Sequence, residues 1–332
     1  MPGNSFGGNN GGAPLKNASL ITRRFSFLGN TEALFEIALI NLFLTLATCG
    51  IYMFWAKVRI RRYLFEQTKF GGDPFCYHGT GPELFRGYLK ATLVFGIPYT
   101  CLTWGPTFLV MDPLIQTATM TLGFVLIAIC IPVAIVGARQ YRLTRTSWRG
   151  IRFSFVGSTW AYVKFYTTSL ILTVITVGAY ATFFDAKSQA FLVSHSYIGN
   201  QSFSFDGNGW DMITNFWLAI LLTPFTLGLS WFWFSAWRKR YFWEHTSFAE
   251  GWFTFTGTGG ELCRLKLVNF FLLVFTLGFA WPWTTIRNAR FLLDHLTFTG
   301  PTDLDTLAQA LQSASPTGDG LDVFLNIGFD LA

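Results

Sequence analysis

The sequence predicts a mainly α-helical membrane protein with about six transmembrane helices, short extramembrane β-strands and roughly five internal repeats of about 50 residues. Only 13% of the residues are charged and 51% are hydrophobic, whereas about a quarter of the residues of a soluble chain are charged. Aromatic residues make up 18% of the chain, and Trp in particular settles at membrane surfaces. This composition favours a protein embedded in lipid.

The spacing of charged residues supports the same fold class, because a helix needs about 20 apolar residues to cross the hydrocarbon region. Six stretches between charges reach this length: 37–56, 91–111, 113–138, 165–184, 212–237 and 267–286. Residues 1–22 are rich in Gly and Asn and are expected to be disordered. Residues 23–300 are expected to form the membrane domain, and residues 301–332 an acidic tail.

A strand-like motif, Phe-x-Phe-x-Gly, recurs along the chain. Alternating aromatic residues before a glycine are typical of a short half-buried strand that ends in a turn. The copies are Phe25/Phe27/Gly29, Phe153/Phe155/Gly157, Phe203/Phe205/Gly207 and Phe253/Phe255/Gly257, with near-copies at Phe75/Tyr77/Gly79 and Leu296/Phe298/Gly300.

A second motif, Thr-x-Gly, lies inside the apolar stretches, where its glycine is Gly50, Gly123, Gly178, Gly228 or Gly278. In four copies this glycine follows the strand glycine by 21 residues, as from Gly257 to Gly278. We expect these five glycines to kink transmembrane helices, where they would allow close packing or mark a gate.

Basic residues are unevenly distributed between the two faces that six alternating spans would create. Loops 57–90, 139–164 and 238–266 hold 18 of the 24 Lys and Arg residues. The positive-inside rule then places this face in the cytoplasm and both termini outside. A rival interpretation makes each Thr-x-Gly a re-entrant turn, so that every unit enters and leaves on one side and all six strands form one sheet.

Charged residues recur at fixed distances after the Thr-x-Gly motif. Arg62, Arg240 and Arg290 stand 12 residues after its glycine, and Glu66, Glu244 and Asp294 stand 16 after it. Residues four apart touch on a helix, so surface ion pairs are one interpretation. The functional alternative is a polar path for an ion or a lipid headgroup.

Three histidines, His195, His245 and His295, occupy one register of the repeat. They could join the polar path by relaying protons or binding a metal, but no HxxxH motif or Cys partner accompanies them. We therefore assign no metal site, no cofactor site and no catalytic residue. The five cysteines show no paired spacing and are expected to be small buried side chains.

The sequence contains no phosphate-binding loop, and the basic clusters beside apolar stretches favour membrane lipids rather than nucleic acid as partners. No nucleophile and base are recognisable together, so an enzyme is not expected.

Several segments are similar to the bacterial YjgN family of uncharacterised multi-pass inner-membrane proteins. They are Phe54-Trp55-Ala56-Lys57, Arg61-Arg62-Tyr63, Gly79-Thr80-Gly81 with Glu83-Leu84, Trp148-Arg149-Gly150-Ile151-Arg152-Phe153, Arg240-Tyr241, Gly257-Thr258-Gly259-Gly260-Glu261-Leu262 and Gly318-Asp319-Gly320-Leu321-Asp322. The resemblance implies a location in the bacterial inner membrane and supplies no known active-site residues.

The function expected from the sequence is transport or channel activity for a small solute or ion, because repeats are common in transporters. The alternative is a non-transporting membrane scaffold that organises lipids or partner proteins. A cavity touched by charged residues of several repeats would favour transport, and a solid apolar interior would favour the scaffold.

Overall fold

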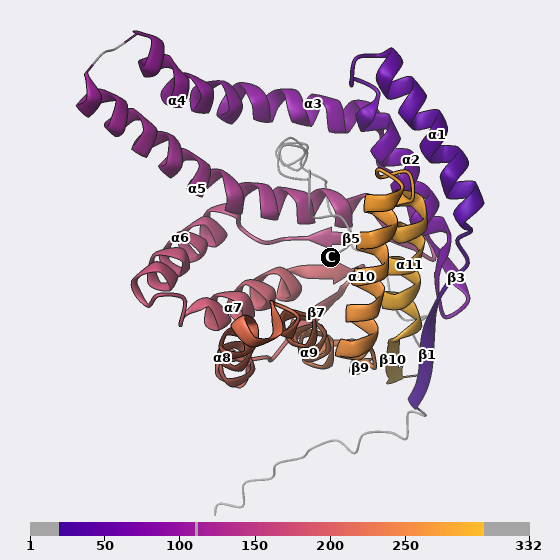
Figure 1. The fold of residues 1–332 in the computed structure, drawn as a ribbon. Coiled ribbons are helices and arrows are strands. Elements are labelled where there is room, and N and C mark those ends of the chain that lie inside the picture. The colour runs from indigo at the N-terminus through magenta and orange to yellow at the C-terminus, as the bar shows by residue number, and fades with distance from the viewer. Residues whose placement is uncertain (1–19, 110–111, 302–332) are drawn as a thin grey trace, which may run out of the picture.

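The computed structural model describes residues 20–109 and 112–301, in which short strands alternate with pairs of helices (Figure 1). The strands are β1 (Leu20–Phe27), β2 (Thr68–Phe70), β3 (Asp73–Tyr77), β4 (Thr146–Trp148), β5 (Ile151–Phe155), β6 (Ser196–Ile198), β7 (Gln201–Phe205), β8 (Thr246–Phe248), β9 (Gly251–Phe255) and β10 (Leu296–Pro301). The helices are α1 (Thr31–Ala47), α2 (Met53–Glu66), α3 (Gly81–Ala91), the π-helix η1 (Thr92–Gly96), α4 (Ile97–Leu109), α5 (Pro113–Thr144), α6 (Thr159–Ile175), α7 (Ala181–Ser194), α8 (Gly209–Thr226), α9 (Ser230–Glu244), α10 (Gly259–Phe275) and α11 (Trp281–Asp294).

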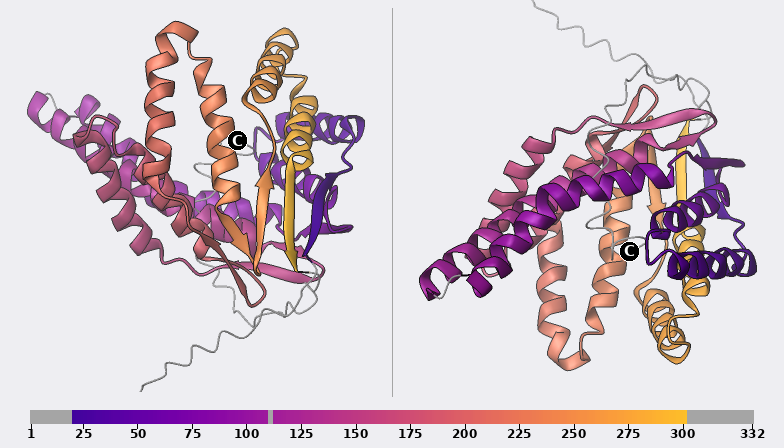
Figure 2. Two further views of the ribbon diagram at one scale, coloured as in Figure 1. Left: turned by 90° about the horizontal axis from the view of Figure 1, so that it is seen from below. Right: turned by 90° about the horizontal axis from the view of Figure 1, so that it is seen from above.

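These strands close into one antiparallel barrel, because β1 pairs with β2 on one side and with β10 on the other. Two-residue turns join neighbouring strands at one rim, and helical hairpins join them at the opposite rim. At the turn between β2 and β3, Gly71 and Gly72 have φ of 60° and 95°, as a tight hairpin turn of matching twist requires. The helical hairpins therefore all lie on the same side of the barrel (Figure 2).

The barrel interior is filled by aromatic and branched side chains. The first aromatic residue of each Phe-x-Phe-x-Gly motif faces an apolar residue on the neighbouring strand: Phe25 faces Phe70, Phe75 faces Trp148, Phe153 faces Ile198, Phe203 faces Phe248 and Phe253 faces Phe298. The rings of Phe25 and Phe70 stack with centroids 4.6 Å apart. Such cross-strand pairs stabilise a sheet, and here they also pack the core of the barrel.

The glycine that ends each motif is explained by the aromatic ring two residues before it. A Cβ atom on Gly29 would lie 2.4 Å from the ring of Phe27, and one on Gly257 would lie 2.6 Å from the ring of Phe255. The ring folds back over the chain and leaves no room for a side chain. The motif is thus a strand end closed by its own aromatic residue.

Four of the helical hairpins are short: α1/α2, α6/α7, α8/α9 and α10/α11. The Thr-x-Gly motif forms each tip, as Thr226 illustrates. Its hydroxyl donates to the carbonyl of Leu222 (2.8 Å) and accepts from the backbone N–H of Ser230 (3.2 Å). The same two bonds occur at Thr48, Thr176 and Thr276. One threonine therefore caps the end of the first helix and the start of the second.

The remaining hairpin is longer, because α3, η1 and α4 run on from one another and return through the 32-residue helix α5. At about 1.5 Å per residue, α5 is about 48 Å long, whereas the 18 residues of α8 extend about 27 Å. Figure 1 shows this hairpin reaching well beyond the others. The fifth Thr-x-Gly motif lies inside α5, where Gly123 packs so closely on α4 that a Cβ atom would lie 2.9 Å from Thr103.

The helices form a ring above the barrel, since each packs on its neighbours in sequence and α11 packs on α1. The returning helices α2, α5, α7, α9 and α11 also pack on the second strand that follows each of them around the barrel, β3, β5, β7, β9 and β1 respectively. The ring of helices therefore closes where the barrel closes.

The prediction of a mainly α-helical fold with six transmembrane helices is wrong, because the chain folds into a ten-stranded closed barrel that carries helical hairpins. Four of the six apolar stretches, 37–56, 165–184, 212–237 and 267–286, reverse direction at a Thr-x-Gly tip. The length of an uncharged stretch does not guarantee one continuous helix. Within the described residues, α5 alone has the length and composition to cross a membrane, with a mean hydropathy of 2.5 over its most apolar window.

The rival interpretation, with turns at the Thr-x-Gly motifs and strands in one sheet, agrees with four of the five motifs, whereas the fifth lies inside α5, and the sheet has ten strands rather than six. Because most of the apolar stretches turn back, the uneven distribution of basic residues no longer places both termini outside. Strand β1 begins at Leu20, inside the segment expected to be disordered. The earlier part of that segment and the acidic tail after residue 301 lie outside the described residues.

Candidate functional site

The three repeated arginines bind backbone carbonyl groups between neighbouring units. Arg62 lies 3.5 Å from the carbonyl oxygen of Gly79, and Arg240 lies 3.2 Å from that of Gly257. Arg290 donates to the carbonyl of Gly29 (3.3 Å), at the other end of the described chain. Each acceptor is the glycine that ends a strand motif, so these arginines connect the returning helices α2, α9 and α11 to the ends of β3, β9 and β1.

The predicted ion pairs between these arginines and Glu66, Glu244 and Asp294 are not among the contacts of the described residues. Instead, acids in the first turn of an ascending helix pair with the end of the returning helix. Glu83 binds Arg145 at 3.1 Å, and Glu261 lies 3.6 Å from the Nε2 of His295. Backbone and hydroxyl hydrogen bonds from Thr258, and then the charge of His295, lower the pKa of Glu261. These contacts close the base of a hairpin.

A sequence pattern does identify Glu83 and Glu261, although the spacing of the repeated arginines and acids does not reveal them. Thr80 with Glu83, and Thr258 with Glu261, each form a capping box, whose Thr-x-x-Glu pattern can be recognised before an apolar run.

The three histidines occupy equivalent places in separate units. The Nδ1 atoms of His195, His245 and His295 lie 2.8, 2.9 and 2.8 Å from the carbonyl oxygens of Phe191, Tyr241 and Phe291 in their own helices. Each ring also packs on that aromatic residue. No group of three or more metal-ligating side chains occurs among the described residues. Each histidine therefore lies at the end of its own helix, and within the described residues the three do not form one site.

Two asparagines in the apolar stretches face the returning helix of their own hairpin. Asn41 donates to the carbonyl of Ala56 (3.4 Å), and Asn269 donates to the side chain of Asn288 (3.0 Å). Both asparagines are buried. They act as interhelical hydrogen-bonding groups, as expected for amides in an apolar segment.

The hairpin tips carry exposed apolar residues in a strained backbone conformation. The middle residues of three Thr-x-Gly motifs, Val177, Leu227 and Leu277, have φ of 50°, 49° and 50° and are 88%, 93% and 89% exposed. Cys49 occupies the same position at the fourth short tip, with φ of 50°. A left-handed conformation costs a residue with a side chain about 1–2 kcal/mol. These tips thus combine strain with an exposed apolar surface.

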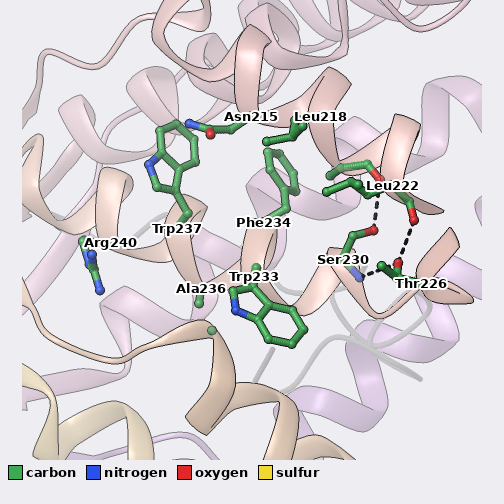
Figure 3. A pocket seen from close by; sticks show the side chains of 12 residues that line it. Asn215, Leu218, Leu222, Thr226, Ser230, Trp233, Phe234, Ala236, Trp237 and Arg240 are labelled. Carbon is green, nitrogen blue, oxygen red and sulfur yellow. Dashed lines mark hydrogen bonds between the residues drawn. The ribbon is translucent and has the colours of Figure 1, made fainter.

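Two cavities lie between hairpins, and Arg240 is the only member of the predicted polar path that lines either of them, among the residues described. The larger cavity, of about 500 Å³, is bounded by α8, α9 and the start of α10 (Figure 3). The smaller, of about 250 Å³, lies between α7, α8 and α9. Asp185 and Arg238 line the smaller cavity and bind each other at 2.9 Å. Positive charge gathers beside both cavities, where burial and then the charges of Lys266 and Arg238 lower the pKa of Lys239.

Comparison with known proteins identifies relatives without an assigned activity. The family model described as "Bacterial protein of unknown function (DUF898)" matches residues 22–225 and 260–323. "Inner membrane protein YjgN" of Salmonella typhimurium (strain LT2) is 32% identical over 167 residues, which are 46% of this chain and 39% of the relative. The protein of that name from Escherichia coli O157:H7 is 36% identical over 131 residues, 40% of this chain and 30% of the relative.

The aligned region thus spans well under half the length of these curated relatives. No solved structure matches the chain. The expected resemblance to the YjgN family is confirmed, and the chain belongs to the DUF898 family of bacterial proteins.

Proposed function

We propose that this chain is a non-enzymatic scaffold of the bacterial inner membrane, which inserts four short hairpins into one leaflet and passes one long hairpin through both. The location in the inner membrane comes from the names of its relatives. Membrane lipids are its proposed partners.

The apolar tips of the short hairpins carry this proposal. In water, Gly or Asn would suit a left-handed, fully exposed position better than Val or Leu. Apolar side chains at Val177, Leu227 and Leu277 gain free energy only if something apolar covers them, about 1.5–3 kcal/mol each when fully buried. Because these hairpins lie on the same side of the barrel (Figure 2), one leaflet could cover them together.

The positions of charged residues set the proposed depth. In α10 and its tip, the apolar run from Lys266 to Leu277 rises about 16 Å, roughly half of a hydrocarbon core about 30 Å thick. In the long hairpin, the run from Lys90 to Leu109 rises about 28 Å. Asp112 caps the start of α5 by accepting from the backbone N–H of Leu114 (2.9 Å). A polar residue at this tip suits the far surface of the membrane.

Basic residues give the proposed orientation. Many lie near the barrel end of the hairpins, as Arg62, Arg142 and Arg240 do. The positive-inside rule then places the barrel at the cytoplasmic face, and Asp112 at the opposite face.

The scaffold is favoured over transport because the barrel interior is packed with aromatic rings, and because the arginines and histidines of the predicted path bind backbone carbonyls. Neither feature provides a route for a solute. Transport remains a prediction from the sequence, and solute uptake measures it directly.

Leaflet-selective lipid labelling tests the proposal. Spin-labelled phospholipid would be placed in either leaflet of proteoliposomes with a known protein orientation, and the motionally restricted fraction measured by electron paramagnetic resonance. We expect restricted lipid mainly in the leaflet beside the barrel, since four hairpins end there and one continues. A panel of entrapped solutes should show no flux above that of empty vesicles.

Equal restriction in both leaflets would contradict one-sided insertion. Protein-dependent flux of any solute would show that the protein is a transporter and not a scaffold.

A further inference from the structure

The larger cavity has the shape of a groove along a hairpin that we propose to lie in lipid, and the ligand assigned to it therefore rests on the proposed function. The groove is lined along α9 from Ser230 near the tip to Arg240 near the barrel. Ten residues of helix separate them, or about 15 Å. This is the scale of an extended acyl chain.

The lining changes from apolar to polar along this length. Leu218, Leu222 and Phe234 line the wall towards the tip, and Figure 3 shows Asn215 and Arg240 on the side away from Ser230 and Thr226. The polar groups at the tip end already have partners, since Ser230 donates its hydroxyl to the carbonyl of Ala219 (3.0 Å). Free hydrogen-bonding capacity is therefore concentrated at the barrel end of the cavity.

Arg240 provides that capacity. One of its terminal nitrogens donates to the carbonyl of Gly257, but its Nε is buried and has no hydrogen-bond partner. A buried donor without a partner is unfavourable, and a charged guanidinium binds anionic oxygens strongly. Arg62 and Arg290 bind the equivalent carbonyls but do not line this cavity.

The surroundings of Arg240 add further positive charge. Lys239 precedes it in α9 and lies near Lys266 of α10. An anionic group near the barrel end would reduce the repulsion between these cations. Trp237 lines the cavity about one helical turn from Arg240, as is typical of side chains at the level of lipid headgroups.

We propose that this cavity binds one anionic phospholipid of the surrounding bilayer, with its phosphate at the guanidinium group of Arg240 and one acyl chain along α8 and α9 towards the tip. The site selects lipids by the charge of the headgroup. The other inter-unit arginines connect helix to strand and bind no lipid in this way.

Native mass spectrometry of the full chain in mild detergent tests this site. Phosphatidylglycerol and phosphatidylcholine with the same chains would be added in a titration, and the fraction of protein that retains one lipid recorded. We expect phosphatidylglycerol to be retained preferentially, and Arg240→Gln to weaken retention about tenfold or more. Arg290→Gln is the matched control, because it loses the same carbonyl bond outside the cavity, and its retention should equal that of the unmodified chain.

A second variant keeps the arginine and fills the groove. Leu222→Trp should also reduce retention of phosphatidylglycerol, because the larger ring occupies the path of the chain. The proposal is overturned if Arg240→Gln and Arg290→Gln lose the lipid equally, if both lipids are retained equally, or if the unmodified chain retains neither. The leaflet measurement on Arg240→Gln separates the two proposals, since one-sided insertion should persist without the bound lipid.

Discussion

The four short hairpins and the long hairpin begin at the same rim of one barrel, but they end differently. The short hairpins reverse at a Thr-x-Gly tip with an apolar residue in the middle, such as Leu227. The long hairpin continues past its own Thr-x-Gly motif in α5 and has Asp112 beside its tip. The contrast indicates that the residue at a tip reports where the tip lies: an apolar tip suits lipid and a polar tip suits water.

The largest expected effect comes from placing a charge at a short tip. Leu227→Asp should lower the free energy of unfolding in lipid nanodiscs by about 2–3 kcal/mol, because a charged residue within the membrane costs about that much. Chemical denaturation in nanodiscs measures the change. Leu114→Asp, at the long tip and 78% exposed, is the control and should change stability by less than about 0.5 kcal/mol. Equal losses would abolish the distinction between the tips.

The same glycine substitution should act by different mechanisms in the two kinds of hairpin. Gly228→Ala should cost roughly 1–2 kcal/mol because Gly228 has φ of +85°. Gly123→Ala should cost roughly 1–3 kcal/mol by overpacking against the methyl group of Thr103. Thr103→Ser removes that methyl group and should restore stability to Gly123→Ala alone, as a double-mutant cycle would measure. Rescue of Gly228→Ala as well would mean that strain at the tip is not the cause.

The capping threonine gives a smaller effect. Thr226→Val removes a donor to Leu222 and an acceptor for Ser230, which should cost roughly 1–2 kcal/mol. The matched change in α5, Thr121→Val, removes a donor to Thr117 within a continuous helix and should cost less than about 0.5 kcal/mol. Urea unfolding of both variants measures the difference, and a larger loss at Thr121 would be unexpected.

The smallest effect is a pH dependence at the base of a short hairpin. Because hydrogen bonds from Thr258 lower the pKa of Glu261 in the folded chain, Glu261 stabilises the fold at pH values above its unfolded pKa of about 4.3. This stabilisation is lost as the pH falls through the lower, folded pKa. The stability difference between the unmodified chain and Glu261→Gln should therefore shrink below about pH 4. A difference that grows on acidification would show that the sign is wrong.

Six of the ten strands, the repeated motifs and the apolar stretches could be predicted from local sequence, because alternating Phe residues and uncharged runs report local burial. The three-residue strands β2, β4, β6 and β8 do not carry the motif and were missed. The reversals at Gly50, Gly178, Gly228 and Gly278 could not be separated from kinks, since the same tripeptide continues as helix at Gly123. Packing of α4 on α5 decides that case, and packing is not a local property. The partners of Arg62, Arg240 and Arg290 could not be predicted either, because each partner lies in the next unit. The partner of Arg290 lies 261 positions away in the sequence.

Cysteine accessibility tests the central claim most directly. Asp112→Cys or Leu227→Cys would be introduced into a chain with the five cysteines replaced by Ala, and a third chain would retain Cys49 with only the other four replaced. Intact cells would then be treated with a membrane-impermeant maleimide. We predict that the probe at 112 is labelled, and that those at 227 and 49 react only after the membrane is dissolved. Labelling at 227 or 49 as fast as at 112, or no labelling at 112 from either face of the membrane, would contradict the account.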